Sequence, residues 1–152
     1  MKNKRLRIEQ LEAKLKGYKS ASIVPVPPSG WLKAIRISLG MTLQQLADKL
    51  SIAKQSVQEM ELREQEGSIT LKNLRETADA LDMHLVYGFV PKDGSIEDLI
   101  DRKAREVAAR IVARTSNTMK LEDQENTPKR LKKAVEERAA ALKNDLPKML
   151  WD

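Results

Sequence analysis

The chain has 152 residues, with 28 Lys and Arg against 22 Asp and Glu, a single His and no Cys. These counts exclude a disulfide framework and metal sites built from thiolates or several imidazoles, so we expect no metal, no cofactor and no catalytic residues. The basic start MKNKRLRIEQ is not followed by an apolar segment, and no apolar run could cross a bilayer. We therefore expect a cytoplasmic protein without a signal peptide or membrane anchor.

The net charge of +6 is distributed unevenly along the chain. Residues 1–30 carry +5, residues 31–90 carry −1 and residues 91–152 carry +2. A basic balance favours a polyanionic partner such as nucleic acid. Because the middle of the chain is slightly acidic, DNA binding there would depend on a few well-placed donors.

Residues 1–30 are predicted to form a basic helix followed by a Pro-rich linker. Leu6, Ile8, Leu11 and Leu15 recur at mostly helical intervals. This helix either packs on the rest of the protein or a partner, or serves as a DNA-contacting arm. In the segment SASIVPVPPSG at 20–30, three prolines and a glycine favour an extended connector.

Residues 31–81 read as four short helices with tight connections. The first carries Trp31, Leu32, Ile35 and Leu39 and ends at Gly40. Thr42 is a good N-cap for the second, LQQLADKL, and Thr70 for the fourth, LKNLRETADAL. The third runs from about residue 53 to 63, with Val57 and Met60 facing inward.

The segment HLVYGFVP changes to a period of two, which predicts one β-strand ended by Pro91. Leu85, Tyr87 and Phe89 share one face of this strand. A lone strand leaves its backbone groups unpaired, and no second strand candidate is near. We therefore expect the strand to pair with its copy in a homodimer.

Residues 92–152 are predicted to form a helical region that makes dimer or partner contacts. One helix is expected over 96–114, a looser segment over 115–127, and a last helix from Pro128 to about residue 144. Trp151, near the end, is expected to dock on another surface. The KRLKK run at 129–133 is more typical of a solvated helix face than of a nucleic-acid contact.

The spacing between residues 43 and 62 fits a helix-turn-helix. Ala47 is the small residue needed where two helices cross, and Ser51 stands at the turn, where a left-handed conformation is common. Ile52, Val57 and Met60 supply the apolar contacts that fix the second helix on the first. The alternative is a helical hairpin whose polar face is merely solvated.

The polar residues of this motif are candidates for DNA contacts. Lys, Gln and Ser are side chains that read base edges, and Glu59 is of the type that accepts from the cytosine amine. Helix N-termini favour phosphate oxygens. The candidate base contacts are Lys54, Gln55, Ser56 and Gln58, and the candidate phosphate contacts are Thr42, Gln44, Gln45 and Lys72.

The strings GMTLQQLADKL, SI and AKQSVQEME, followed by SITLKNLRETADALDM, resemble the four central helices of the Cro/repressor-type helix-turn-helix family. Ser51 stands where that family usually has Gly, and Ala53 where it usually has a Ser or Thr cap. The resemblance implies a mainly α, lambda-repressor-like bundle, here with the one strand and with flanking helices at both ends. The domains are then 1–30, 31–91 and 92–152.

A wider resemblance covers nearly the whole chain. PPSGWLKAIRISLGMTLQQLA, EGSITLKNLRETADALDMHLVYGFVP, AREVAARIVARTSNTMKLEDQ and the ending LW are similar to the mobile mystery protein A family. This resemblance implies a regulator carried on mobile genetic elements, beside a gene for a Fic-domain protein. The pair then looks like a toxin–antitoxin arrangement.

Two functions follow from these patterns. The first is a dimeric, sequence-specific regulator that binds double-stranded DNA, acts on its own operon and serves as antitoxin to the adjacent Fic-domain protein. The alternative is a protein-binding antitoxin module with only weak DNA binding. An enzyme is disfavoured, because His84 has no companion base, nucleophile or ligand.

Overall fold

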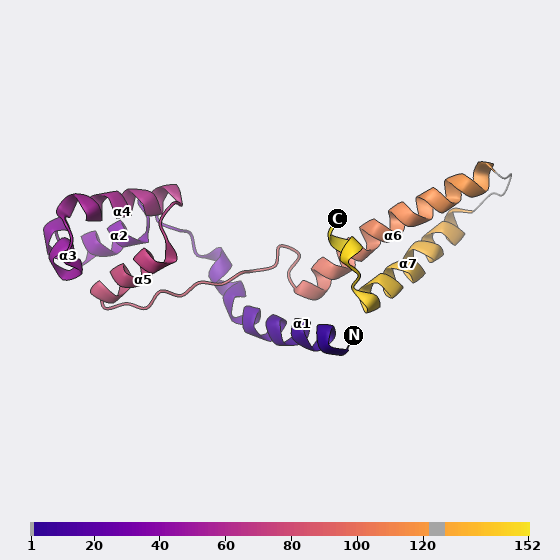
Figure 1. Ribbon diagram of the computed structural model, residues 1–152, viewed down its shortest axis with the longest axis horizontal. Coiled ribbons are helices and arrows are strands. Elements are labelled where there is room, and N and C mark those ends of the chain that lie inside the picture. The colour runs from indigo at the N-terminus through magenta and orange to yellow at the C-terminus, as the bar shows by residue number, and fades with distance from the viewer. Residues whose placement is uncertain (1, 122–126) are drawn as a thin grey trace. The chain divides into compact units, whose positions relative to one another are not determined.

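The computed structural model describes residues 2–121 and 127–152, which form two compact units (Figure 1). We call residues 20–88 the central unit, and residues 1–19 together with 89–152 the flanking unit. Both units are built from helices, and the described residues contain no β-strand.

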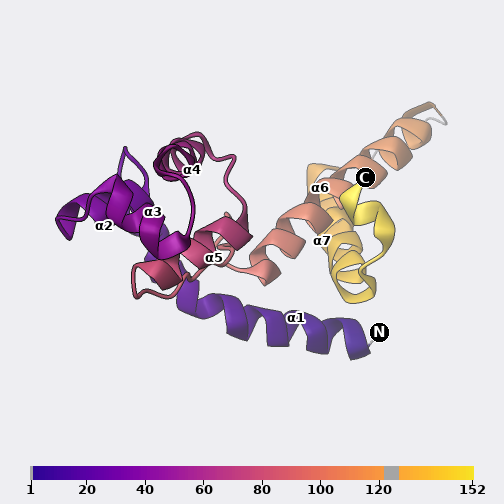
Figure 2. The ribbon, with the colours of Figure 1, turned by 60° about the vertical axis from the view of Figure 1, so that its left-hand side comes forward.

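The central unit contains four α-helices: α2 (Trp31–Ser38), α3 (Leu43–Leu50), α4 (Lys54–Glu66) and α5 (Leu71–Ala80). Figure 2 views α4 nearly along its axis, whereas α3 and α5 run across the view. Leu46, Ala47 and Val57 have no exposed surface, and Leu32 and Leu81 complete the buried core. The predicted four-helix arrangement is therefore confirmed, with α4 three residues longer at its C-terminus than expected.

Local signals in the sequence set most of the helix ends. Gly40 follows α2 with a φ of 67°, and Thr42 and Thr70 accept hydrogen bonds from the N–H groups of Gln45 and Asn73, both at 3.1 Å. These three positions confirm the predicted stop and caps. The start of α2 depends instead on a distant residue, because the Glu64 carboxylate accepts from the N–H groups of Trp31 and Leu32, each at 2.7 Å.

A buried ion pair joins α2 to α4. Arg36 Nε lies 2.8 Å from Glu61 Oε1, and Arg36 also donates to the carbonyl of Met41 at 3.0 Å. Arg36 is 8% exposed and Glu61 is 5% exposed, so water reaches neither charge freely. The pair fixes α2 on α4, although neither residue stood out in the sequence.

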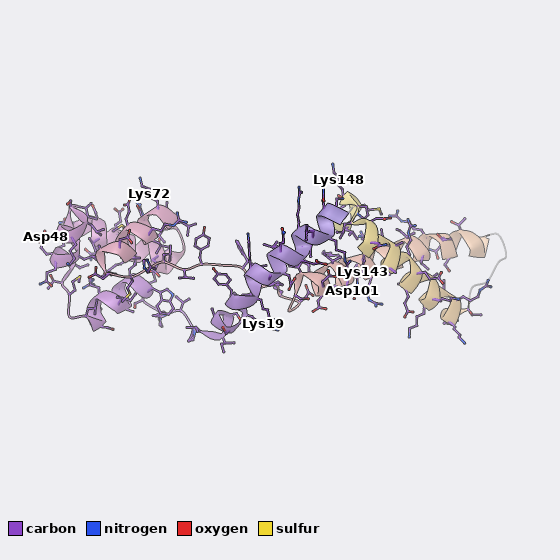
Figure 3. All side chains as sticks on the ribbon, turned by 90° about the horizontal axis from the view of Figure 1, so that it is seen from below. Lys19, Asp48, Lys72, Asp101, Lys143 and Lys148 are labelled. Atoms are coloured by element: carbon purple, nitrogen blue, oxygen red, sulfur yellow. The ribbon has the colours of Figure 1, made fainter. Side chains whose placement is uncertain are left out.

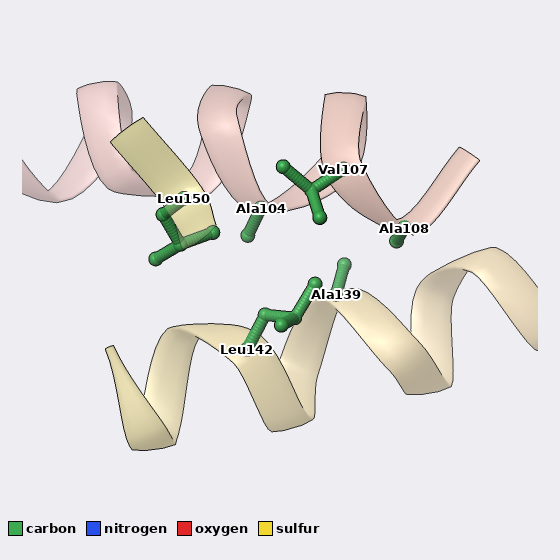
Figure 4. Packing of buried hydrophobic residues seen from close by; sticks show 6 residues of the cluster. All are labelled: Ala104, Val107, Ala108, Ala139, Leu142 and Leu150. Atoms are coloured by element: carbon green, nitrogen blue, oxygen red, sulfur yellow. The ribbon is translucent and has the colours of Figure 1, made fainter. Parts of the chain in front are cut away.

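The core of the flanking unit lies between two long antiparallel helices (Figure 4). These are α6 (Ile96–Leu121) and α7 (Pro128–Asp145), followed by the 3₁₀ helix η2 (Lys148–Trp151). Three alanines, Ala104, Ala108 and Ala139, lie at their interface together with larger apolar residues. Small side chains allow the two helix axes to approach closely, and Leu150 of η2, which is 1% exposed, covers one end of this core.

The N-terminal helix α1 (Lys2–Leu15) belongs to the same unit and meets the ends of α6 and α7 through polar contacts. Glu12 accepts from the N–H of Ile96 at 2.7 Å, which caps α6. Arg5 lies 3.8 Å from Glu97, and Lys4 donates to the carbonyl of Leu146 at 3.3 Å. Leu6 and Leu11 remain about half exposed, so the predicted apolar stripe is only partly covered.

Ion pairs hold the base of the hairpin formed by α6 and α7. Arg102 forms ion pairs with Asp93 and Glu106. The Asp101 carboxylate pairs with Arg105 Nε at 2.9 Å and with Lys143 Nζ at 3.1 Å. Figure 3 shows Asp101 and Lys143 close together, from α6 and α7 respectively. Hydrogen bonds from Arg102 lower the pKa values of the Asp93 and Glu106 carboxyls, and hydrogen bonds from Arg105 and then Lys143 lower the pKa of Asp101.

The predicted β-strand is not supported, because the described residues of the single chain contain no strand. Residues 83–91 are extended, but no other extended segment of the described chain lies beside them to form a ladder. Leu85 is half-buried, whereas Tyr87 and Phe89 are 52% and 78% exposed. Val86, on the opposite face of the alternation, is 71% exposed, so the apolar alternation does not mark a buried face in the single chain.

Three smaller expectations also need correction. The connector does not become extended at residue 20, because the 3₁₀ helix η1 (Lys16–Ile23) continues until Pro25 prevents further helix. Helix α6 continues to Leu121 and so includes the first part of the segment 115–127 that was expected to be loose, whereas residues 122–126 lie outside the described residues. Within this part of α6 the hydroxyls of Thr115 and Thr118 donate to carbonyls one turn back at 3.1 Å. Trp151 is 54% exposed, and its neighbour Leu150 docks instead.

Among the described residues, no helix combines the length and apolar character needed to cross a membrane. In the same part of the chain, no group of three or more His, Cys, Asp or Glu is placed to hold a metal ion.

Candidate nucleic-acid interface

A reciprocal cap defines the N-terminus of α3. The Thr42 hydroxyl accepts from the N–H of Gln45, and the Gln45 side-chain oxygen accepts from the N–H of Thr42 at 2.8 Å. This capping box uses the carbonyl oxygen of Gln45 and leaves its amide nitrogen to donate outward. Thr42 and Gln45 therefore act mainly as caps of α3. The donors that remain available for a phosphate contact are the Gln45 amide nitrogen and the free N–H groups of the first turn.

The turn between α3 and α4 has the geometry that the spacing predicted. Ser51 is left-handed, with φ 56° and ψ 42°, and the N–H of Ile52 donates to the carbonyl of Ala47 at 3.0 Å. Ala47 is fully buried at the crossing, as expected. Ile52 is 37% exposed, so Val57 and Met60 provide most of the apolar contact.

The solvent-facing side of α4 presents most of the predicted base-reading residues. Lys54, Gln55 and Gln58 are exposed, as is Glu59. Ser56 is half-buried and lines a separate cavity of about 280 Å³ beside Met60 and Asn73, so it is less available than its neighbours. The structure therefore brings together three of the four predicted base contacts on one accessible helix face.

A groove of about 410 Å³ extends this face toward α2. Gln55, Gln58 and Gln65 of α4 line it, and Lys33 lies on the opposite wall. Lys33 was missed in the sequence, where it reads as an ordinary exposed residue of α2. Its position beside the polar face of α4 depends on how the two helices pack, so no local pattern could have found it.

The acidic residues of α4 are largely engaged within the protein. Glu61 pairs with Arg36, Glu64 accepts from two N–H groups of α2, and Glu59 lies 3.3 Å from Arg63. Three of the four carboxylates on this helix thus have a partner that offsets their charge. This arrangement reduces the repulsion that an acidic helix would exert on DNA phosphates.

The remaining candidates lie on α3 and α5. The Gln44 amide donates to Asp48 Oδ1 at 2.8 Å, which ties this side chain along its own helix. Lys72 projects from the first turn of α5 (Figure 3), and its side chain is 83% exposed with Glu76 4.0 Å away. The exposed Lys72 side chain can therefore reach a phosphate, whereas Gln44 would first have to break its hydrogen bond to Asp48.

Comparison with known proteins agrees with this geometry. Residues 32–87, from α2 to the extended segment after α5, match a helix-turn-helix family model of the Cro/C1 type. This part of the chain is a helix-turn-helix domain of that class, and the domain supports a role in DNA binding and regulation. A search of curated proteins and a search of solved structures each found no match.

Proposed function

We propose that the protein is a sequence-specific transcription regulator that reads the major groove of double-stranded DNA with α4. The observation that carries this proposal is the exposed face formed by Lys54, Gln55 and Gln58 on a helix held by the left-handed turn at Ser51. A major groove about 12 Å wide admits such a helix. Gln pairs with adenine and Lys with guanine through their major-groove edges.

Phosphate contacts would fix the position of α4 on the duplex. Lys72 and the amide of Gln45 stand at the N-termini of α5 and α3, where free N–H groups and the helix dipole favour an anion. We add Lys33 as a further donor, because it lines the groove beside Gln55 and Gln58. Gln44 and Ser56 contribute less, since one is tied to Asp48 and the other is half-buried.

The test is binding of the full chain to the DNA upstream of its own gene, compared with a scrambled duplex of equal length. Gln55→Ala should weaken binding to the specific duplex by about 1–3 kcal/mol, roughly 5- to 150-fold, and leave the scrambled duplex unaffected. Gln10→Ala, on the exposed surface of α1, is the matched control. Equal affinity for both duplexes in the unmodified chain would refute sequence-specific reading.

A homodimer would place two α4 helices on half-sites about 34 Å apart. The extended segment 83–90 supports this proposal, because Val86, Tyr87 and Phe89 are more than half exposed and its backbone has no ladder partner in the described chain. An apolar cavity of about 420 Å³ lies beside it, between Trp31, Leu74 and Val86. Pairing of two such segments would satisfy both the backbone and the apolar side chains.

Light scattering tests this pairing. Tyr87→Pro removes a backbone donor from the centre of the segment and should shift the protein toward the monomer. Circular dichroism should show the helices unchanged, because residue 87 lies outside them. An intact dimer in this variant would reject strand pairing as its basis.

A second candidate function is neutralisation of a partner protein, and the flanking unit favours it. This unit lies entirely outside the matched helix-turn-helix, and it exposes Trp151 and Met149 beside its buried core. Exposed aromatic side chains are typical anchors of protein interfaces. The resemblance to the mobile mystery protein A family suggests that the partner is a Fic-domain enzyme and that the protein regulates the operon that the two genes share. On this proposal the protein acts in the cytoplasm, and it acts by binding and not by catalysis.

Co-expression with the product of the adjacent gene tests this candidate. The two proteins should elute together, and Trp151→Ala should weaken the complex while leaving DNA binding intact. Separate elution of the unmodified proteins would count against a role as antitoxin. The DNA-binding proposal would stand in that case, because its test uses the chain alone.

A further inference from the structure

The hairpin of α6 and α7 divides its charges unevenly between its two ends. Near its base, the α6 cations of residues 102–105 each face a carboxylate: Arg102 pairs with Asp93 at 2.8 Å, Lys103 with Glu106 at 3.6 Å and Arg105 with Asp101 at 2.9 Å. Lys143 of α7 reaches Asp101 as well. This end of the hairpin is therefore largely neutralised from within.

At the other end, most of the cations have no acidic partner among the residues that the structure describes. We call the following six exposed residues of α6 and α7 the basic tip: Arg110, Arg114, Lys129, Arg130, Lys132 and Lys133. Residues 107–118 and 127–135 contain no Asp or Glu, and the one ion pair that the structure describes for these six joins Lys133 to Glu137 at 3.9 Å. Over 107–135 the sequence holds seven basic and three acidic residues, a net charge of +4 that includes the acids of 122–126.

The basic tip acts against the folding of its own helix. Four of its cations lie within the first six residues of α7, and no acidic residue occupies the first turn. The N-terminus of a helix carries a partial positive charge, so cations there are destabilising. Among the described residues the basic tip has one acidic partner, Glu137, so its charges lower the stability of α7 with little compensating attraction. This imbalance points to an anion outside the protein.

The chemistry around the basic tip fits phosphate better than an acidic protein. None of the large apolar side chains exposed on the described chain lies within 107–118 or 127–135. A protein interface needs an apolar centre, whereas phosphate binding needs cations and small polar donors. The amide side chain of Asn117 is exposed on the same stretch of α6 and can donate, whereas the hydroxyls of Thr115 and Thr118 already donate to carbonyls of their own helix.

We propose that the basic tip binds the phosphate backbone of DNA, as a second contact surface in addition to the helix-turn-helix. This inference rests on the proposed function, because that function identifies DNA as the source of the phosphates. Because it contacts phosphates, this surface adds affinity and salt dependence without adding sequence preference.

The test compares two triple variants of the full chain that lose the same charge. Lys129→Gln, Arg130→Gln and Lys132→Gln neutralise the tip, while Lys14→Gln, Lys92→Gln and Lys148→Gln neutralise exposed cations elsewhere in the flanking unit. Binding to a duplex of about 40 base pairs is measured across a salt series. Each lost phosphate contact reduces the magnitude of the slope of log K against log salt by about 0.9. The slope should therefore decrease by roughly 2–3 in the tip variant and by less than about 1 in the control variant.

Two further measurements complete the test. The double variant Arg110→Gln with Arg114→Gln should reduce the magnitude of the salt slope by about 1–2. The triple variant of Lys129, Arg130 and Lys132 should have a melting temperature no lower than that of the unmodified chain, because the cations that it loses are unfavourable at the N-terminus of α7. An unchanged slope in both tip variants, or an equal loss in the control, overturns the basic tip as a phosphate surface. If the unmodified chain binds no duplex at all, the proposed function fails first and the inference falls with it.

Discussion

At the scale of single residues, a left-handed serine sets the angle between α3 and α4. Ser51 has a φ of 56°, a conformation that costs residues with a Cβ atom about 1 kcal/mol more than glycine. The turn is nevertheless formed, because Ala47, Val57 and the hydrogen bond from Ile52 hold the two helices in place. The strain is local and can be relieved without changing the contacts.

Ser51→Gly should therefore stabilise the central unit by roughly 0.5–1 kcal/mol. Denaturant unfolding measures the change. Ser38→Gly, in the last turn of α2, is the matched control and should destabilise by about as much, because Gly is a poor helix former. A loss of stability in Ser51→Gly would show that the left-handed backbone is not strained.

The buried pair of Arg36 and Glu61 is the second feature at this scale. Glu61→Ala leaves the Arg36 guanidinium buried at 8% exposure without a counter-charge, and should cost about 3–5 kcal/mol in the free energy of unfolding. The double variant Arg36→Met with Glu61→Leu should recover most of that loss, because it removes both charges together. A single variant within about 1 kcal/mol of the unmodified chain would contradict this account.

At the scale of elements, the two helices of the DNA-binding motif differ in how they begin. Helix α3 has the reciprocal cap of Thr42 and Gln45, whereas Ala53 precedes α4 and offers no side-chain cap. Ala53 has φ −72° and ψ 150°, which is the backbone conformation of an N-cap. The N–H of Ser56 donates to the Ala53 carbonyl at 3.0 Å, so the N–H groups of Lys54 and Gln55 are the ones left open to a phosphate or to water.

Ala53→Ser should supply the missing cap and stabilise the central unit by about 0.5–2 kcal/mol in thermal or denaturant unfolding. Ala141→Ser, on the exposed side of α7, should instead destabilise slightly, since Ser is a weaker helix former than Ala. No gain in Ala53→Ser would mean that the N–H groups of this turn are already satisfied.

At the scale of the whole molecule, the flanking unit depends on acidic groups whose folded pKa values are lowered. Hydrogen bonds from Arg102 hold the pKa of Asp93 below 3.8 and that of Glu106 below 4.5, and hydrogen bonds from Arg105 and Lys143 do the same for Asp101. A carboxyl whose folded pKa is depressed contributes stability that is present above its unfolded pKa and is lost as the pH falls through the folded value.

The melting temperature of the flanking unit should therefore fall as the pH is lowered from about 5 toward 3. Thermal unfolding of the full chain at a series of pH values measures this. Asp101→Asn removes the carboxyl that joins α6 to α7 through Lys143, so its melting temperature should depend less steeply on pH over the same interval. An identical pH profile in that variant would contradict the assigned role of Asp101.

Local sequence patterns were sufficient to predict the four central helices and many of their ends. Caps, stops and the period of apolar residues are local, so Gly40, Thr42 and Thr70 and the turn at Ser51 could be identified without the fold. The exposed face of Lys54, Gln55 and Gln58 followed from the same helical period.

Contacts between residues far apart in the chain could be identified only from the folded structure. Arg36 meets Glu61 across 25 positions, and Glu64 caps α2 across 32 and 33 positions, so no local pattern marks either contact. The apolar alternation at 83–90 predicted a strand, but a strand also needs a neighbour, and the described chain provides none. Packing likewise placed Lys33 beside α4, because the position of one helix on another is set by their shared core and not by either sequence alone.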